Sequence, residues 1–299
     1  MITIKVPATT ANLGPGFDTL GMALSLFLEV NMAFSSENSI ECYGVDADEL
    51  NKELEKNLIM QAAKMVLEKA GRSDQCLHIQ INNEIPLGKG LGSSAAAIVA
   101  GMFGANELLG KPYPRDRVLA WAVEMEGHAD NIVPAVMGGL TTALLSDHKV
   151  QCYKITPPVQ LKMVLAVPDF ELPTPQSRSV LPAQVTFGEA VQMMQKSCFL
   201  LASLSNGDFE NIQGAMNDEL IQPKRKMFIP AFDQVVNSAL EAGARGVALS
   251  GAGPSIIAMT VDHEEEIGAA MKNAFLESSV PSKVYVLHPC TEGMTLLVS

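Results

Sequence analysis

A glycine- and serine-rich segment stands directly before a long apolar helical stretch of this 299-residue chain. The segment consists of Pro86, Leu87, Gly88, Lys89, Gly90, Leu91, Gly92, Ser93, Ser94, Ala95 and Ala96. Its glycines let the backbone approach an anion closely, and the free N–H groups of the first helical turn form an anion-binding site with the helix dipole. Ser93 and Ser94 could simply cap the helix. Three glycines and two serines within seven residues exceed what a cap requires, so the segment predicts a phosphate site.

The pattern differs from two common nucleotide-binding motifs. A Walker loop ends in Lys followed by Ser or Thr, whereas Lys89 lies inside this loop. Residues 90–95 match the dinucleotide fingerprint G-x-G-x-x-A, but they follow a proline-containing break rather than a strand. In addition, no acidic residue ends a second strand about 20 residues further on. A nicotinamide-dependent oxidoreductase is therefore a weak interpretation.

Two further glycine-containing segments lie between apolar stretches. Residues 7–21, with the sequence PATTANLGPGFDTLG, hold Asn12 and Asp18. Such a stretch is usually a surface loop, but its apolar flanks indicate partial burial, where an amide and a carboxylate need partners, and this favours substrate contacts. The segment LSGAGPSI holds Gly251 and Gly253, which suit either a tight turn or a close backbone approach to a phosphate.

A cluster of polar residues lies at the end of a predicted helix and directly after it. Its members are Glu124, Glu126, His128, Asp130 and Asn131. A solvated helix end is the ordinary explanation of the two glutamates, and a lone histidine at such a junction is more often structural. However, four of the polar residues lie within six positions, directly before the apolar stretch 132–140, and this concentration indicates a site.

The three glycine-containing segments, in this order, resemble the three motifs of the GHMP kinase superfamily. They lie at residues 7–21, 86–96 and 249–256, so the resemblance spans the whole chain. The opening segment resembles in particular the homoserine kinases of that superfamily. The resemblance implies an α+β fold of two lobes, with a ribosomal-protein S5-like N-terminal lobe at residues 1–155 and a ferredoxin-like C-terminal lobe at residues 156–299.

The same resemblance implies a reaction and its cofactors. The γ-phosphate of ATP would be transferred to the side-chain hydroxyl of L-homoserine, which forms O-phospho-L-homoserine on the way to threonine. The nucleotide contacts that it implies are residues 86–96, Asn57, Thr174, Gly251 and Gly253. By its sequence alone, Asn57 is an ordinary helix N-cap. Ser94 and Glu126 would bind Mg²⁺, with Glu124 as the competing carboxylate.

The expected substrate-binding residues match the charges of homoserine. Its carboxylate suits a bidentate guanidinium, and its ammonium suits a carboxylate or an amide oxygen. By the resemblance, Arg178 and Arg225 hold the carboxylate, although an arginine is otherwise most often an exposed surface residue. The other residues that the resemblance places at the substrate are Asn12, Asp18, His128 and Asn131. Whether a general base acts is left open.

The amino-acid composition limits the classes of molecule that this protein can bind. Hydrophobic residues make up 47% of the chain and charged residues 18%, which is typical of a folded globular protein. The net charge of −12 makes nucleic acid and anionic membrane surfaces poor partners, so a phosphate must be held by local groups. Five scattered cysteines without a C-x-x-C pattern predict reduced thiols in a cytoplasmic protein. We expect neither a signal peptide nor a membrane span, and a homodimer is possible.

Apolar periodicity and turn residues predict the elements that position these side chains. Strands are expected at residues 2–6, 77–81, 140–145, 150–155, 161–167 and 283–287, with one or two strands within residues 20–34 and a strand–turn–strand unit at 247–261. Helices are expected at residues 54–70, 93–109, 115–126, 187–204, 208–216, 231–242 and 264–276. The first strand is expected to stop at Pro7, and a hinge is expected at Pro157 and Pro158. Because strands and helices alternate without a regular βαβ rhythm, the order favours an α+β fold.

Two other functions compete with this interpretation. One is a kinase of the same fold that acts on another hydroxy acid such as mevalonate, which has no ammonium to engage Asn12 and Asp18. The other is a ligand sensor without catalysis, which should have lost the loop serines or the acidic metal ligand. Ser93, Ser94 and Glu126 are all present. A homoserine-directed kinase is therefore the favoured hypothesis.

Overall fold

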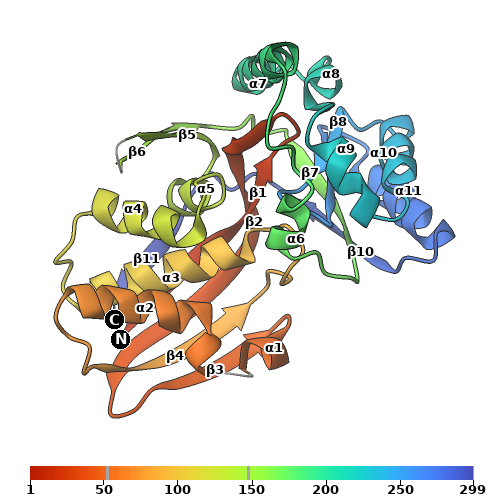
Figure 1. Ribbon diagram of the computed structural model, residues 1–299. Coiled ribbons are helices and arrows are strands. Elements are labelled where there is room, and N and C mark those ends of the chain that lie inside the picture. The colour runs from red at the N-terminus through yellow and green to blue at the C-terminus, as the bar shows by residue number, and fades with distance from the viewer. Residues whose placement is uncertain (52–53, 147–148, 299) are drawn as a thin grey trace.

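A long antiparallel hairpin forms the centre of the N-terminal sheet. Its strands are β1 (Ile2–Asn12) and β2 (Gly16–Ser35). The computed structural model describes residues 1–51, 54–146 and 149–298, and it orders this sheet β11-β1-β2-β4-β3, with β5 pairing with both β2 and β6. The other strands are β3 (Ser39–Gly44), β4 (Cys76–Asn83), β5 (Leu140–Ser146), β6 (Lys149–Ile155) and β11 (Thr295–Val298). The hairpin thereby carries both of its polar ends, at residues 9–12 and 16–18, toward the second lobe (Figure 1).

Helices cover one face of this sheet (Figure 1). They are α1 (Ala47–Asn51), the short 3₁₀ helix η1 (Leu54–Lys56), α2 (Leu58–Lys69), α3 (Ser93–Leu108), α4 (Arg115–Glu126) and α5 (Ile132–Met137). The central helix α3 contacts α2, α4 and α5 as well as β1 and β2. Its only charged residue is Glu107, and most of its side chains are buried, as its apolar sequence predicts. This burial fixes the position of its N-terminus at Ser93.

The C-terminal lobe is built on a second, four-stranded antiparallel sheet. Its strands are β7 (Lys162–Pro168), β8 (Gly246–Leu249), β9 (Ile256–Thr260) and β10 (Ser282–Leu287), in the order β10-β7-β9-β8. Helices α10 (Phe232–Glu241) and α11 (Glu264–Glu277) pack on it around a separate apolar core. This strand order is that of a split βαβ, or ferredoxin-like, unit. The expected α+β fold of two lobes is confirmed.

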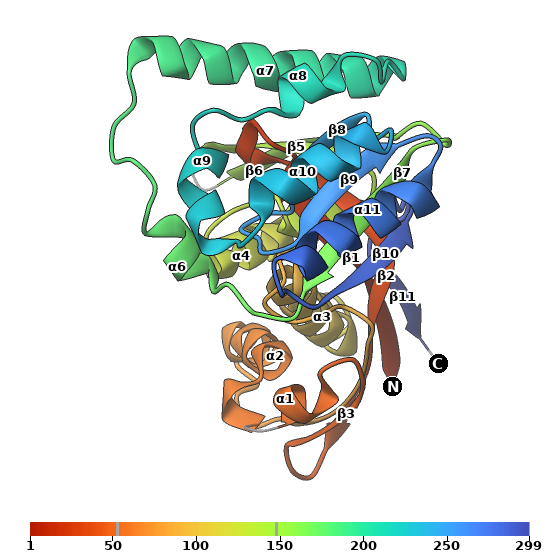
Figure 2. The ribbon, with the colours of Figure 1, turned by 90° about the vertical axis from the view of Figure 1, so that its right-hand side faces the viewer.

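Besides α10, the segment between β7 and β8 forms several helices, two of which carry arginines to the junction of the lobes. They are α6 (Thr174–Arg178), α7 (Phe187–Asn206), α8 (Ile212–Met216), α9 (Gln222–Arg225) and the 3₁₀ helix η2 (Lys226–Phe228). Figure 2 shows α7 and α8 at the top of the molecule and α6 and α9 nearer the N-terminal lobe. Each of α6 and α9 ends in an arginine, Arg178 and Arg225 respectively.

Several expected elements need correction. The first strand does not stop at Pro7, because β1 shifts register between Pro7 and Ala8 and continues to Asn12. A proline at a bulge is tolerated because no ladder hydrogen bond needs its missing N–H there. The helix expected at residues 54–70 is divided at Asn57, and the one expected at 208–216 begins only at Ile212.

The division of the chain into lobes at residues 155 and 156 stays a prediction. Strand β6 ends at Ile155 and β7 opens the second sheet, but the C-terminal strand β11 returns to pair with β1. The five cysteines are free, as expected for reduced thiols. Within the described residues, every helix is too short or too polar to cross a bilayer.

Candidate active site

A cavity of about 170 Å³ lies where the hairpin, the glycine- and serine-rich loop and the C-terminal lobe meet. All six residues expected at the substrate line it: Asn12, Asp18, His128, Asn131, Arg178 and Arg225. It is also lined by the expected nucleotide and metal residues Gly88, Gly90, Gly92, Ser93, Ser94, Glu126, Thr174, Gly251 and Gly253. Residues from both halves of the chain therefore converge on one site.

Hydrogen bonds tie the three glycine-containing segments together at this cavity. The Asn12 side chain donates to the Gly251 carbonyl at 3.0 Å, and the Gly251 N–H donates to the Ala11 carbonyl at 3.1 Å. The Ser250 hydroxyl lies 2.7 Å from the Gly90 carbonyl and 3.0 Å from Thr10 Oγ1. The three segments thus form one continuous wall, although they are far apart in sequence.

Glycine is required in the loop because the backbone passes so close to this wall. Gly90 has a φ of +75°, and an added Cβ would lie 2.2 Å from the Ser250 carbonyl oxygen. Gly92 has a φ of +69°, and an added Cβ would lie 2.0 Å from Thr9 Oγ1. Both positions combine a left-handed backbone with a contact that no side chain can make.

Replacing Gly90 with Ala is expected to lower the free energy of unfolding by about 2–4 kcal/mol, because left-handed strain and overpacking add. Urea unfolding of the purified variant measures this. Gly214 in α8 is the matched control, since an added Cβ there meets nothing within 4 Å. Gly214→Ala should leave stability unchanged or raise it slightly. Equal stability of Gly90→Ala and Gly214→Ala would contradict the close packing of the loop.

The N-terminus of α3 is open to the cavity. Its N-cap is Gly92, which provides no side-chain hydrogen bond to the first turn. The simple capping role considered for Ser93 and Ser94 is therefore not what the structure shows, and both serines line the cavity. The first N–H groups of a helix have no partner within the helix, so this uncapped end is suited to an anion.

Glu126, and not Glu124, lies beside the loop. The Ser94 hydroxyl donates to Glu126 Oε2 at 2.7 Å. Burial raises the pKa of the Glu126 carboxyl above its ordinary value, against the hydrogen bond from Ser94 and the charges of His128 and Arg178, which lower it. Glu124 instead lines a different cavity with Arg117 and Trp121. The structure thus places one of the two competing glutamates next to Ser94.

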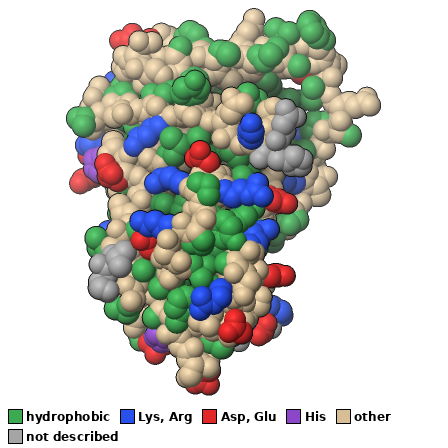
Figure 3. All heavy atoms as spheres, turned by 90° about the vertical axis from the view of Figure 1, so that its left-hand side faces the viewer, with side chains coloured by type: hydrophobic (Ala, Val, Ile, Leu, Met, Phe, Trp, Pro, Cys, Tyr) green, Lys and Arg blue, Asp and Glu red, His purple; other side chains and the backbone are tan. Residues whose placement is uncertain are grey.

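One cation of α2 and one of α4 lie over the ring of Trp121. Figure 3 looks onto the side of the N-terminal lobe at the left of Figure 1, where Lys and Arg side chains lie among apolar ones. Lys69 Nζ lies 4.8 Å and Arg117 Cζ 5.4 Å from the centre of the Trp121 ring. These distances are typical of cation–π contacts within a folded protein.

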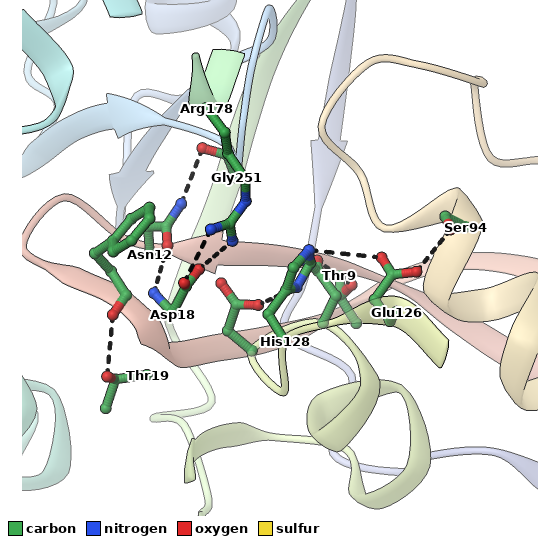
Figure 4. A network of polar contacts seen from close by, with 12 residues as sticks. Thr9, Asn12, Asp18, Thr19, Ser94, Glu126, His128, Arg178 and Gly251 are labelled. Atoms are coloured by element: carbon green, nitrogen blue, oxygen red, sulfur yellow. Dashed lines mark hydrogen bonds and ion pairs between the residues drawn. The ribbon is translucent and has the colours of Figure 1, made fainter. Parts of the chain in front are cut away.

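A chain of polar contacts leads inward from Glu126 (Figure 4). His128 Nε2 lies 3.9 Å from Glu126 Oε1, and His128 Nδ1 lies 2.8 Å from Asp130 Oδ1. Burial lowers the pKa of His128, but the hydrogen bond and charge of the buried Asp130 outweigh it, so the pKa lies above its ordinary value. Asn131 accepts a hydrogen bond from Thr9 Oγ1 at 2.8 Å. Four members of the polar cluster, Glu126, His128, Asp130 and Asn131, therefore form part of the cavity wall.

Asp18 and Arg178 join the two lobes across the cavity (Figure 4). Arg178 Nη1 donates to Asp18 Oδ2 at 3.1 Å, and Nη2 donates to Asp18 Oδ1 at 2.5 Å. Asp18 has a φ of +53°, and its N–H donates to Asn12 Oδ1 at 3.1 Å. The carboxylate expected for the substrate ammonium and the guanidinium expected for its carboxylate thus pair with each other.

Arg225 is a buried cation that hydrogen-bonds to neutral groups. Its side chain is 2% exposed, and it donates to the carbonyls of Gly251, at 3.0 Å, and Ser177, at 3.4 Å. Burial first, and then the nearby charge of Arg178, lower the pKa of Arg225 to about 10. A buried cation strongly favours an anion within reach.

Some of the expected site residues lie away from the cavity. The Asn57 side chain accepts from the N–H groups of Ile59 and Met60, as a helix N-cap, and lines a separate cavity of about 270 Å³. The Lys89 ammonium turns to the C-terminal lobe and donates to the Asp169 carbonyl at 2.8 Å. The cavity lining also lacks Pro86, Leu87, Leu91, Ala95 and Ala96. It contains five residues that were not expected there from the sequence, namely Ala11, Asp130, Leu172, Pro173 and Ala252. Asp130 belongs to the polar cluster, and Ala11 and Ala252 lie inside two of the glycine-containing segments, whereas no sequence motif marks Leu172 or Pro173.

Comparison with known proteins identifies the family. The family described as "GHMP kinases N terminal domain" matches residues 57–139, and the one described as "GHMP kinases C terminal" matches residues 200–277. The homoserine kinase of Carboxydothermus hydrogenoformans is 40% identical over 300 residues, which cover 100% of this chain and 98% of that protein. That of Moorella thermoacetica is 41% identical over 297 residues, or 99% of this chain and 100% of that protein. The chain belongs to the homoserine kinase family.

A solved structure of a homoserine kinase confirms the fold assignment. The crystal structure of the Cytophaga hutchinsonii protein superposes with a TM-score of 0.87 at 34% identity and covers 99% of this chain and 97% of that one. As a member of the homoserine kinase family, this protein is a kinase that uses ATP and acts on a small molecule. The comparisons thereby support the favoured hypothesis over the mevalonate-directed alternative.

Proposed function

We propose that this protein transfers the γ-phosphate of ATP to the side-chain hydroxyl of L-homoserine. The observation that carries the proposal is the convergence, in one cavity, of two arginines and a carboxylate with the Ser94–Glu126 pair at an uncapped helix end. In the transfer, the bond between Pγ and the oxygen bridging it to the β-phosphate breaks. A bond from the homoserine hydroxyl oxygen to Pγ forms, and the hydroxyl proton is released.

The phosphate end of the cavity is the loop with the N-terminus of α3. We assign the β- and γ-phosphates to the N–H groups at Gly90, Gly92 and Ser93, with Thr174 and the turn at residues 251–253 on the opposite wall. The cavity beside Asn57, lined also by Leu50, Leu58 and Ala97, would hold the adenine. Because transfer passes through a loose transition state, positioning and charge neutralisation supply most of the rate.

Ser94 and Glu126 fit the requirements of a magnesium site. Their side-chain oxygens lie 2.7 Å apart at the helix end, and both are hard oxygen donors. Mg²⁺ commonly takes one or two protein ligands together with substrate phosphates and water, so a larger cluster is unnecessary. The described residues contain no group of three or more His, Cys, Asp and Glu side chains arranged for a metal, which agrees with this small ligand set. When bound, the ion neutralises charge on the transferring phosphate.

The amino-acid end of the cavity is the group of Asn12, Asp18, Arg178 and Arg225. In the described structure, Asp18 and Arg178 form an ion pair with each other. A zwitterionic substrate would replace this pair with two, one between its carboxylate and an arginine and one between its ammonium and Asp18. Arg178 and Arg225 would then take the carboxylate, and Asp18 with Asn12 would take the ammonium. His128 and Asn131 would face the hydroxyl. A substrate with only one of the two charges would leave one partner unpaired.

Asp130→Asn is expected to lower kcat less than about tenfold, because a loose transition state needs little deprotonation of the attacking hydroxyl. Asp130 is 3% exposed and accepts from His128, so its role is to hold that ring rather than to take the proton. A pH–rate profile of the variant checks this. A loss of about 100-fold or more, with the acid limb abolished and the fold intact, would identify Asp130 as the general base.

A coupled ADP-release assay on the purified protein tests the proposed function. L-homoserine should be turned over with the highest kcat/KM among L-homoserine, mevalonate and galactose. Nucleotide hydrolysis that is independent of every hydroxyl substrate would refute the proposal. Thermal shift with the same compounds distinguishes a sensor, which binds without turnover, from an enzyme.

Location and assembly are further parts of the proposal. We assign the protein to the cytoplasm because its cysteines are free. We also propose a homodimer, supported by the exposed apolar side chains of Phe187, Met194 and Phe199 on α7. Analytical ultracentrifugation at several concentrations tests the assembly.

A further inference from the structure

An aromatic ring lies against both arginines of the cavity. Arg178 Cζ lies over the ring of Phe17 at 5.2 Å from its centre, and Arg225 Cζ lies over it at 5.3 Å. Phe17 precedes Asp18 in β2, whereas the two arginines end the short helices α6 and α9. One ring from the N-terminal lobe therefore contacts two cations of the C-terminal lobe.

These contacts stabilise two arginines whose positive charges lie close together. Two guanidiniums that converge on one carboxylate repel each other when the cavity holds no anion, and the charge of Arg178 does lower the pKa of Arg225. Asp18 neutralises Arg178 by a bidentate pair, but the hydrogen bonds of Arg225 run only to carbonyl groups among the contacts described. The electron-rich face of an aromatic ring attracts a cation without forming a salt bridge, so the substrate carboxylate need not displace it.

We propose that Phe17 is a positioning residue for substrate recognition, because its ring holds Arg178 and Arg225 in the convergent geometry that a substrate carboxylate requires. This inference rests on the proposed function, since it assumes that the arginines bind the carboxylate. Phe17 is half-buried, outside the apolar core, so its packing alone gives little reason for an aromatic residue. Its ring orders the two side chains before the substrate arrives, which reduces the entropy lost on binding.

The test compares Phe17→Leu with Phe17→Tyr, which keeps the ring. Each cation–π contact at a partly exposed site changes an equilibrium constant about two- to fivefold, so Phe17→Leu should raise the KM for L-homoserine about tenfold. The kcat and the KM for ATP should change less than about twofold, and Phe17→Tyr should behave as wild type. Thermal melting verifies folding, and Phe17→Met replaces Phe17→Leu if the latter does not fold.

A double-mutant cycle separates positioning from a merely structural role. In an Arg225→Leu background, one of the two cations is gone, so the effect of Phe17→Leu on kcat/KM should be clearly smaller than in wild type. The inference is overturned if Phe17→Leu leaves the KM for L-homoserine unchanged, if Phe17→Tyr is equally impaired, or if the effect is undiminished in the Arg225→Leu background. Failure of the proposed function itself is distinct, because wild type would then show no homoserine-dependent ADP release.

Discussion

Glu126→Gln and Ser94→Ala are each expected to lower kcat about 100-fold or more. Ser94→Ala removes a side-chain oxygen, and Glu126→Gln replaces a charged carboxylate with a neutral amide, at the place where charge develops during phosphoryl transfer. Losses of this size are typical when such stabilisation is removed. Ser94→Ala also removes the hydrogen bond that Glu126 Oε2 accepts at 2.7 Å, and therefore leaves a largely buried carboxylate without that donor. ATP binding measured without Mg²⁺ should change little, because the loop itself is retained.

Glu124→Gln is the matched control, since this residue lies two positions away and lines a different cavity. It should keep nearly full activity. Steady-state kcat as a function of Mg²⁺ concentration distinguishes the variants, because only the loss of a metal ligand should raise the Mg²⁺ requirement. If Glu124→Gln is crippled while Glu126→Gln is normal, the assignment of the metal site to Glu126 is wrong.

Arg178→Leu and Arg225→Leu are each expected to lower kcat/KM for L-homoserine at least about tenfold, with the affinity for ATP nearly unchanged. A hydrogen bond to a charged group contributes about 1.5–3 kcal/mol, and a partner left buried without it costs more. The net charge of −12 strengthens the expectation, because an anionic carboxylate is repelled unless cations converge on it locally. Removing Arg178 also leaves Asp18 without its bidentate partner.

Further variants and a substrate analogue serve as controls for the two arginine substitutions. They test whether the loss of activity comes from misfolding and whether recognition depends on the charges of the substrate. Arg225 is fully buried, so Arg225→Lys keeps the charge but loses the planar fork, and it should be impaired without a comparable loss of melting temperature. Arg72→Leu on the exposed surface should be neutral. Wild type should also phosphorylate a hydroxy acid without the amino group far less well than L-homoserine. Full activity of both leucine variants would show that the carboxylate binds elsewhere.

The loop at residues 86–96 illustrates what a sequence reveals reliably. Glycines followed by serines at the start of an apolar helix allow the backbone conformation of the loop to be predicted from the sequence. This is possible because positive φ angles and a helix end are local properties. The helix α3, the end of α4 at Glu126 and most strands were likewise predicted from periodicity and turn residues. Where a proline interrupted the pattern at Pro7, the prediction failed, because the neighbouring strand held β1 in the sheet beyond it.

The choice between Glu124 and Glu126 shows where local reasoning stops. Residues two positions apart on a helix point about 200° apart, so only one of them can face a given cavity. The sequence shows both carboxylates, but it does not indicate which side of the helix faces the loop. Packing of α4 against α3 decides it, and Gly127, with a φ of +89°, then turns the chain so that His128 follows on the same side.

By itself, the sequence determined the α+β class, the phosphate loop and, through its resemblance to a kinase superfamily, the set of residues to examine. Only the tertiary structure decided which of them meet. Asp18 and Arg178 are separated by 160 positions and come from different lobes, yet they form a bidentate pair. The ring of Phe17 lies over two arginines from two short helices that have no periodic signal. Such contacts depend on how the two sheets are placed relative to each other, and that arrangement is set by packing between distant segments rather than by any local pattern.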